Sequence, residues 1–122
     1  MTTPNPKRPS DAPTTWLNQT FTITIDRPLG STHPKHPTII YPINYGYIPN
    51  TLAADGHEID AYILGIDAPI TTFTGQCIAI IHRLDDVEDK LIIAPSGQAY
   101  TDTEITAQTD FQEQYFKTRL IR

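Results

Sequence analysis

Short apolar segments separated by turn-forming residues recur through the middle of this chain. Residues 21–26 alternate apolar and polar side chains, which is typical of a half-buried strand. Glycine, proline and aspartate separate this segment from further apolar segments. We expect strands to begin at residues 38–41 and to occupy residues 59–65, 76–84 and 90–95, the last closed by a proline. Five short strands of this kind predict a small antiparallel β-barrel.

A helix is predicted after the last strand. Thr101 and Glu104 have the spacing of a capping box, in which each side chain bonds the backbone amide of the other residue. The helix is expected to continue to about Leu120 and to pack across the barrel through one largely apolar side. The residues of that side are Ile105, Ala107, Phe111, Tyr115, Phe116 and Leu120. The predicted fold class is therefore α+β, a five-stranded antiparallel barrel with a C-terminal α-helix.

The N-terminal segment differs in composition from the rest of the chain. Residues 1–18 are polar and rich in proline, without a periodic apolar face, so we expect a disordered tail before a single domain of residues 19–122. The only cysteine, Cys77, lies in an apolar segment and is expected to be a small buried hydrophobe. One unpaired cysteine fits a reducing cytosol.

Charge and hydropathy exclude some classes of partner. The formal net charge of -5 argues against nucleic acid, whose binding surfaces are strongly basic. No apolar run approaches the roughly 20 residues of a membrane span, and no signal-peptide order is present at the N-terminus. We therefore expect a cytoplasmic protein that binds neither nucleic acid nor membrane.

Acidic residues gather in two turns. The stretch Asp55-Gly56-His57-Glu58-Ile59-Asp60 lies shortly after Tyr45, and more acids occupy residues 85–89 between the fourth and fifth expected strands. Gathered carboxylates repel one another, so a cation that holds them together is expected, and a divalent metal is the first candidate. Taken alone, an acidic hairpin turn is more often simply solvated.

Three motifs in a fixed order carry a family resemblance. They are Tyr41-Pro-Ile-Asn-Tyr45-Gly-Tyr-Ile-Pro-Asn-Thr51, then Asp55-Gly56-x-x-x-Asp60, then Asp85 before a strand that opens with Lys90 and ends Ala94-Pro95. From Phe21 to the C-terminal helix the chain resembles the soluble (family I) inorganic pyrophosphatases. The resemblance implies an OB-like barrel and metal-dependent hydrolysis of pyrophosphate to phosphate, by attack of metal-bound water and without a covalent intermediate.

The resemblance also implies roles for particular residues. Metal-binding positions are Asp26, Asp55, His57, Asp60, Asp85 and Glu88, and Glu88 stands where the family has an aspartate. Phosphate-binding positions are Lys35, Tyr41, Tyr45, Lys90 and Tyr115. Two further phosphate-binding candidates do not match a family position: Lys117, one step after the place of a family lysine, and Arg27. Catalytic roles fall to Tyr45, Lys35, Asp60 and Lys90, and to His57 if it replaces the lost acid. Mg²⁺ is the expected cofactor, because it prefers oxygen ligands and retains several waters.

His57 is the departure that matters most for activity. In the family its position holds the aspartate assigned to the attacking water. His57 could act as the base or as a nitrogen ligand, which would favour Mn²⁺, Co²⁺ or Zn²⁺. It could instead be a neutral replacement that abolishes hydrolysis but leaves anion binding. The third hypothesis is a turn histidine facing solvent, with Glu58 taking over as the acid.

A second departure is the short connection from Lys35 to Tyr41, where the family inserts a hairpin carrying a phosphate-binding arginine. One hypothesis is that Arg27, His33, Lys35 and His36 supply the lost positive charge; the alternative is a proline-stiffened surface loop with incidental basic residues. The opened site could also accept another small diphosphate, or the chain could be a non-catalytic metal- and phosphate-binding module. Self-association into a homo-oligomer is possible on the family pattern.

Overall fold

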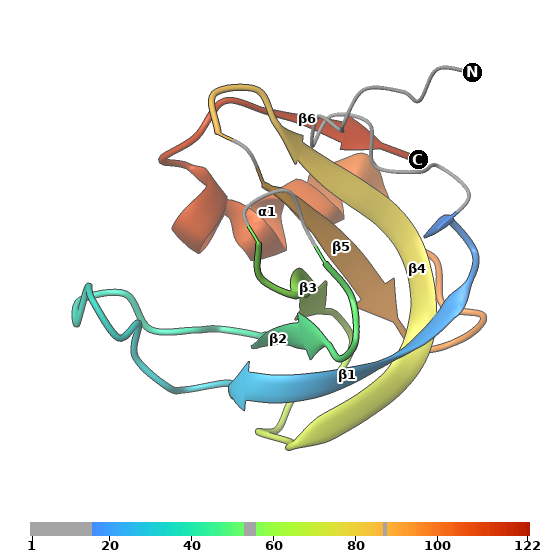
Figure 1. Cartoon of the computed structure of the whole chain (residues 1–122), viewed down its shortest axis with the longest axis horizontal. Helices are drawn as coiled ribbons and strands as arrows, with labels where there is room; N and C mark the ends of the chain where they lie inside the picture. The colour runs from blue at the N-terminus through green and yellow to red at the C-terminus, as the bar shows by residue number, and fades with distance from the viewer. Residues whose placement is uncertain (1–15, 53–55, 87) are drawn as a thin grey trace.

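One closed sheet and one helix form the domain in the computed structural model, which describes residues 16–52, 56–86 and 88–122 (Figure 1). The elements in chain order are β1 (Thr20–Arg27), β2 (Asn44–Ile48), β3 (Ile59–Ile63), β4 (Thr72–Arg83), β5 (Asp89–Ala94), α1 (Asp102–Glu113) and β6 (Thr118–Ile121). Strands follow the order β1-β2-β3-β5-β4-β6, and an additional pairing of β1 with β4 closes the first five into a barrel. The tail predicted for residues 1–18 falls mostly outside the described residues.

The predicted five-stranded OB-like barrel with a C-terminal helix is confirmed, with one difference in strand direction. Strand β3 pairs with β5 in parallel, whereas the other pairings are antiparallel, so the barrel is mixed. The parallel register places Asp60 opposite Lys90. Two residues from separate motifs thereby become neighbours on the sheet.

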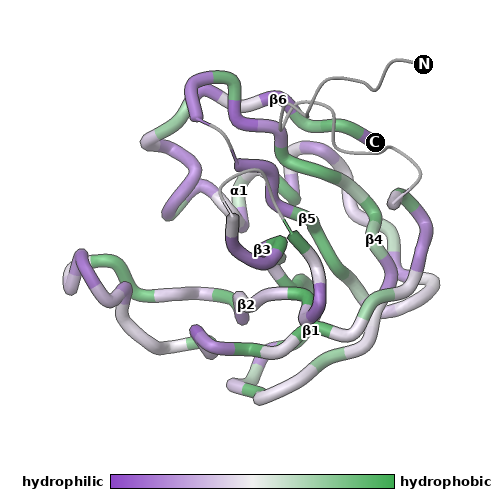
Figure 2. Tube along the Cα trace, in the orientation of Figure 1, coloured by the Kyte–Doolittle hydropathy of each residue, from purple (hydrophilic) through white to green (hydrophobic). Residues whose placement is uncertain are grey.

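Two apolar clusters stabilise the domain, one inside the barrel and one between the barrel and α1. The alternation of β1 explains the first, since Ile23 and Ile25 point inward and are buried. The second cluster joins Tyr45 and Tyr62 to Ile105 of the helix. Strands β4 and β5, which carry long apolar stretches, contribute to both clusters (Figure 2).

The helix is shorter than the sequence predicted. It ends at Glu113, and the chain then forms β6, which pairs antiparallel with β4 so that Leu120 lies opposite Ile81. The capping box of Thr101 and Glu104 is confirmed. The predicted apolar side is confirmed at Ile105 and at Phe111, which packs on the same cluster, and wrong at Ala107 and Tyr115, which are exposed; the other buried helix residues are Thr109, Gln112 and Glu113. Residues 118–121 satisfied the helical spacing, but the open edge of β4 binds them as a strand.

The second expected strand also begins later than predicted. Residues 38–41 contribute an isolated bridge between Thr32 and Ile40, and β2 starts at Asn44. Pro42 lacks the amide hydrogen that a continuous ladder would use. Among the described residues, no helix is long and apolar enough to cross a membrane.

Cys77 is fully buried in the barrel, and burial raises the pKa of its thiol to about 11. We therefore expect the folded protein to resist a thiol reagent at neutral pH, because the thiolate is the reactive form. In denaturant the same residue should react completely within minutes. Rapid labelling of the folded protein, measured by mass spectrometry, would contradict the placement of β4.

Candidate active site

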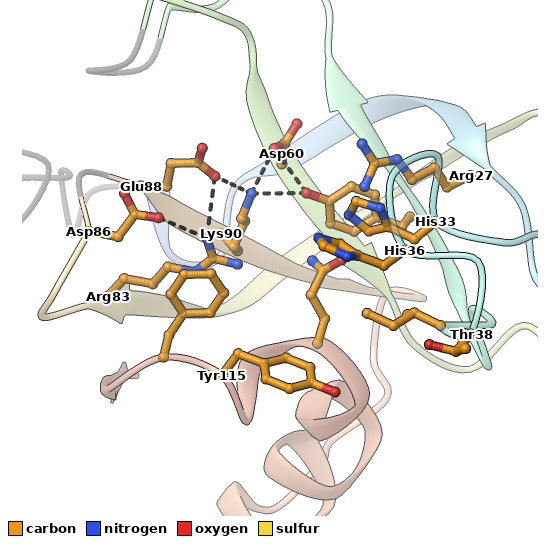
Figure 3. Close-up of a pocket in the computed structure, with 14 residues that line it drawn as sticks. Arg27, His33, His36, Thr38, Asp60, Arg83, Asp86, Glu88, Lys90 and Tyr115 are labelled. Carbon is orange, nitrogen blue, oxygen red and sulfur yellow. Dashed lines mark hydrogen bonds and ion pairs between the residues drawn. The ribbon is translucent and has the colours of Figure 1, made fainter.

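A cavity of about 530 Å³ opens between the barrel, the end of α1 and the loop that follows β1 (Figure 3). Its wall combines carboxylates, cations, two imidazoles and aromatic rings. The charged and imidazole members are Arg27, His33, His36, Asp60, Arg83, Asp86, Glu88 and Lys90. A polar cavity of this size is large enough to hold a small anionic ligand.

Lys90 is the centre of this site. Its ammonium lies 2.7 Å from Asp60 Oδ2, 2.5 Å from Glu88 Oε1 and 2.9 Å from the hydroxyl oxygen of Tyr45. The Tyr45 hydroxyl in turn donates to Asp60 Oδ2 at 2.9 Å. Lys90 is only 3 % exposed, so the surrounding oxygens replace the hydration of a buried charge.

The protonation states follow from this geometry. Burial alone would lower the pKa of Lys90, but Tyr45, Asp60 and Glu88 outweigh it and raise the pKa well above its ordinary value. Burial raises the pKa of Tyr45 as well. Lys90 is therefore a permanent cation at neutral pH, and Tyr45 is a neutral hydroxyl donor.

Arg83, at the end of β4, forms a second buried ion pair. Its Nε and Nη2 donate to the two carboxylate oxygens of Glu113 at 3.0 and 2.8 Å, a bidentate arrangement. Asp86 accepts from Nη1 at 3.2 Å, and the guanidinium lies 3.6 Å from the centroid of the Phe116 ring. Burial alone would lower the pKa of Arg83, but Glu113 above all, with Tyr62 and Glu88, outweighs it and raises the pKa above its ordinary value.

A hydrogen-bonded chain connects the two arginines of the cavity through the helix. Arg27 donates to the Tyr41 hydroxyl at 2.6 Å, and Tyr41 donates to Gln112 Oε1 at 2.7 Å. The amide of Gln112 donates to Tyr62 at 2.7 Å, and Tyr62 donates to Glu113 at 2.5 Å. Gln112 and Glu113 thus fix the positions of both guanidinium groups.

Sequence reasoning missed these two helix residues. Thr109, Gln112 and Glu113 share the buried side of α1 with Ile105. Thr109 stands four residues after Ile105, and Gln112 and Glu113 stand three and four residues after Thr109; this helical spacing was the available signal. Polar side chains at such positions are usually assigned to the solvent face, so the signal points to a buried network only once the barrel tyrosines are known.

The structure brings together about half of the predicted site residues. Those that line the cavity are Arg27, Tyr45, Asp60, Glu88, Lys90 and Tyr115. Tyr41 lies buried beneath the wall and bonds Arg27. Others lie outside the lining: Asp26, Lys35, His57, Asp85 and Lys117. Their predicted roles stay predictions.

Asp85 does not line the cavity. Both of its carboxylate oxygens accept from the backbone amide of Lys117 at 3.2 Å, in the turn before β6. The neighbouring Asp86 lines the cavity instead and bonds Arg83. A shift of one residue in a short turn reverses which acid points inward, and the spacing of the motif alone does not specify it.

The metal ligands are only partly described. Asp55 lies outside the described residues, and the described residues contain no group of three or more histidine, cysteine, aspartate or glutamate side chains that could hold an ion. Asp26 lies at the end of β1. Burial raises the pKa of its carboxyl, and the negative charges of Asp60 and Glu58 raise it further, although Arg27 opposes them. The negative charge on the carboxylate side of the cavity therefore continues toward β1.

A closed barrel with one covering helix has the OB-like architecture, and its cavity places a lysine between two carboxylates. Residues 17–119 match the sequence model of the family described as inorganic pyrophosphatase. The chain therefore belongs to the inorganic pyrophosphatase family. This result confirms the resemblance that the tyrosine and aspartate motifs carried.

Individual relatives agree with this assignment. An inorganic pyrophosphatase of Saccharolobus solfataricus is 37 % identical over 62 residues, which cover 48 % of this chain and 36 % of that protein. One of Neisseria meningitidis serogroup B is 31 % identical over 81 residues, covering 62 % of this chain and 45 % of that protein. The matches span less than half the length of these curated relatives.

Solved structures share the fold. The inorganic pyrophosphatase of Ehrlichia chaffeensis superposes with a TM-score of 0.64 at 15 % identity, covering 84 % of this chain and 85 % of the other. That of Neisseria gonorrhoeae gives 0.62 at 21 % identity, covering 79 % and 73 %. At these identities the likeness supports the architecture.

Proposed function

We propose that this protein hydrolyses inorganic pyrophosphate to phosphate in a reaction that depends on a divalent metal. The observation that carries the proposal is the buried Lys90, held by Asp60, Glu88 and Tyr45 at the wall of a polar cavity. The family membership of residues 17–119 supports the substrate. The cytoplasmic location and possible self-association stay predictions.

The described carboxylates fit a hard cation. In the described part of the chain, every hydrogen bond accepted by the Asp60 carboxylate uses Oδ2, and every one accepted by the Glu88 carboxylate uses Oε1. The other carboxylate oxygens, Asp60 Oδ1 and Glu88 Oε2, therefore remain as metal ligands. Both side chains contact the ammonium group of Lys90. An all-oxygen set of this kind suits Mg²⁺ better than a softer metal. Asp26 and Asp55 are the further ligands that we propose.

The protein side chains would act mainly by charge and position. Lys90 and Arg27 neutralise phosphate charge, and the Tyr45 hydroxyl orients Asp60. A divalent cation, when bound, would polarise the phosphoryl oxygens and lower the pKa of a water molecule. The buried network through Gln112 holds Arg27 in place, so the guanidinium needs little reorganisation when charge develops.

The direct test is phosphate release from pyrophosphate by the purified protein with Mg²⁺, Mn²⁺, Co²⁺ or Zn²⁺. We expect release with at least one metal and none after chelation. A parallel panel of nucleoside diphosphates and triphosphates tests the alternative that another diphosphate is the substrate. Pyrophosphate binding without release under any metal would support the non-catalytic module instead.

His57 decides how much activity the chain retains. The residue is exposed and follows Gly56, whose φ of 88° forms the turn before β3. If the family's acid is required for the attacking water, His57→Asp should raise the Mg²⁺-dependent rate about 10²-fold or more, the usual contribution of a positioned base. His57→Asn serves as a control for the loss of imidazole. An unchanged rate in His57→Asp would indicate that Glu58 or another group already supplies the acid.

A further inference from the structure

The two sides of the cavity differ in how their cations are paired (Figure 3). On the side of β4 and β5, Lys90 and Arg83 each contact two or more carboxylates. On the loop side, Arg27, His33 and His36 line the same cavity, and no carboxylate in the described part of the chain forms an ion pair with them. Positive groups without paired acids at a cavity wall indicate a place for an anion.

Arg27 is held firmly on this side. Its Nη1 donates to the buried Tyr41 hydroxyl, and its guanidinium lies 5.7 and 5.3 Å from the ring centroids of Tyr41 and Tyr45. A guanidinium carries five N–H donors, so one hydrogen bond to Tyr41 leaves several for a ligand. The group is therefore positioned before any anion arrives.

The two histidines are positioned by the loop. Their ring centroids are 4.8 Å apart, and the His33 ring stacks on Tyr41 with a centroid distance of 6.3 Å and an interplanar angle of 16°. His33 Nδ1 accepts from the backbone amide of Lys35 at 3.0 Å, so Nε2 carries the proton of the neutral ring. A second proton would be taken up at Nδ1 and would release this exposed amide to solvent. Pro34 and Pro37 restrict the backbone around the pair.

We propose that Arg27, His33 and His36 form a subsite for a tetrahedral oxyanion, such as one phosphate group of a diphosphate, and that binding is coupled to proton uptake by His33. The proposal deepens the proposed function, because this phosphate group would belong to its substrate or product. The paired acids across the cavity would then face the metal, and the loop would face the phosphate.

The proton coupling follows from the charges around His33. Burial lowers the pKa of this imidazole, and Arg27, His36 and Lys35 lower it further. At neutral pH the ring is therefore mostly neutral in the free protein. A bound dianion offsets the neighbouring cations and raises the pKa of His33, so the complex takes up a proton. By linkage, anion affinity must rise as the pH falls toward and below about 6.5.

Other titratable groups face this pair without cancelling the effect. Tyr41, beneath His33, and Tyr45, from β2, stay neutral at these pH values, because burial raises the pKa of both hydroxyls. Across the cavity Asp60 and Glu88 contact Lys90, and Asp86 contacts Arg83. Tyr115, after α1, completes the wall. Asp26, beside Arg27 on β1, is the acid on this side; its charge acts on Arg27, whereas the charges that act on His33 are those of Arg27, His36 and Lys35.

Sulfate is the suitable probe, because it is tetrahedral and stays a dianion across the range in which histidine titrates. We expect its affinity, measured by titration calorimetry without metal, to rise about tenfold between roughly pH 8 and pH 6. Titrations in two buffers of different ionisation enthalpy should show uptake of about one proton near the middle of this range. The double variant His33→Gln/His36→Gln should lose the pH dependence and about tenfold of the affinity at the lower pH.

Arg119→Gln, which removes an exposed cation on β6 outside the cavity, is the matched control and should bind sulfate like the wild type. If the double variant does not fold, histidine ring NMR of the wild type replaces it: sulfate should move the His33 signals toward the protonated form and leave those of His82 in place. Unchanged affinity in the double variant, absence of proton uptake, or unmoved His33 signals would overturn the proposal. Pyrophosphate hydrolysis is assayed separately, with metal present. Failure of the anion subsite and failure of the proposed function can therefore be told apart.

Discussion

Lys90→Met is expected to lower the rate of pyrophosphate hydrolysis about 10²- to 10³-fold, the loss typical of removing one preorganised charge from an active site. Lys90 is the only group that contacts Asp60, Glu88 and Tyr45 together among the described residues. Without its charge the two carboxylates repel each other, and the phosphate loses a buried cation. The comparison is made on steady-state rates at saturating metal and substrate.

Folding must be separated from chemistry in this variant. Removing a buried cation that two acids share also destabilises the protein, so thermal unfolding of Lys90→Met should be measured beside its activity. Rates are then compared well below the melting temperature. Arg119→Met, which removes a cation outside the cavity, should keep wild-type activity. A folded Lys90→Met protein that retains more than about a tenth of the wild-type rate would contradict the role assigned to Lys90.

Glu113→Ala is expected to lower the free energy of unfolding by about 3–5 kcal/mol, because it breaks a buried ion pair by removing one partner. Arg83 and Glu113 are only 5 % and 6 % exposed, and Glu113 also accepts from the Tyr62 hydroxyl. The substitution leaves the Arg83 guanidinium and the Tyr62 hydroxyl without the carboxylate that accepts their hydrogen bonds. Since small domains are stable by roughly 5–15 kcal/mol, much of the total stability should be lost. Urea unfolding followed by tryptophan fluorescence measures the change.

Two further variants make this measurement specific. Asp110→Asn changes an exposed acid of the same helix and should alter stability by less than about 0.5 kcal/mol. The double variant Arg83→Met/Glu113→Leu replaces the pair with apolar side chains and should recover most of the loss. If Glu113→Ala costs less than about 1 kcal/mol, the buried pair does not support the end of α1.

The barrel was predictable because its strands are short and amphipathic or wholly apolar, and turn residues separate them. The parallel pairing of β3 with β5 was not, since these strands are distant in sequence and nothing local specifies their direction. Residues 118–121 show the opposite difficulty. Their apolar spacing suited a helix, but the exposed edge of β4 pairs with them as β6. Tertiary pairing decided both features.

The site divides in the same way. Tyr45, Asp60, Glu88 and Lys90 were predicted from the family resemblance of their motifs, and the structure brings all four together at one wall. The links through Gln112 and Glu113 were missed, because polar residues near a helix end are ordinarily solvated. Their partners lie 30 to 71 residues earlier in the chain, so only the packing of α1 on the barrel reveals them. The predicted role of His57 stays a prediction.

The central claim is that one cavity holds a metal on its carboxylate side and phosphate on its loop side. Anomalous diffraction from crystals grown with Mn²⁺ and imidodiphosphate, a diphosphate that resists hydrolysis, tests it most directly. We expect a manganese peak bonded to Asp60 and Glu88, with a phosphate group of the ligand against Arg27, His33 and His36. Manganese at Asp85 or at the histidines, or a diphosphate bound elsewhere on the molecule, would contradict the account.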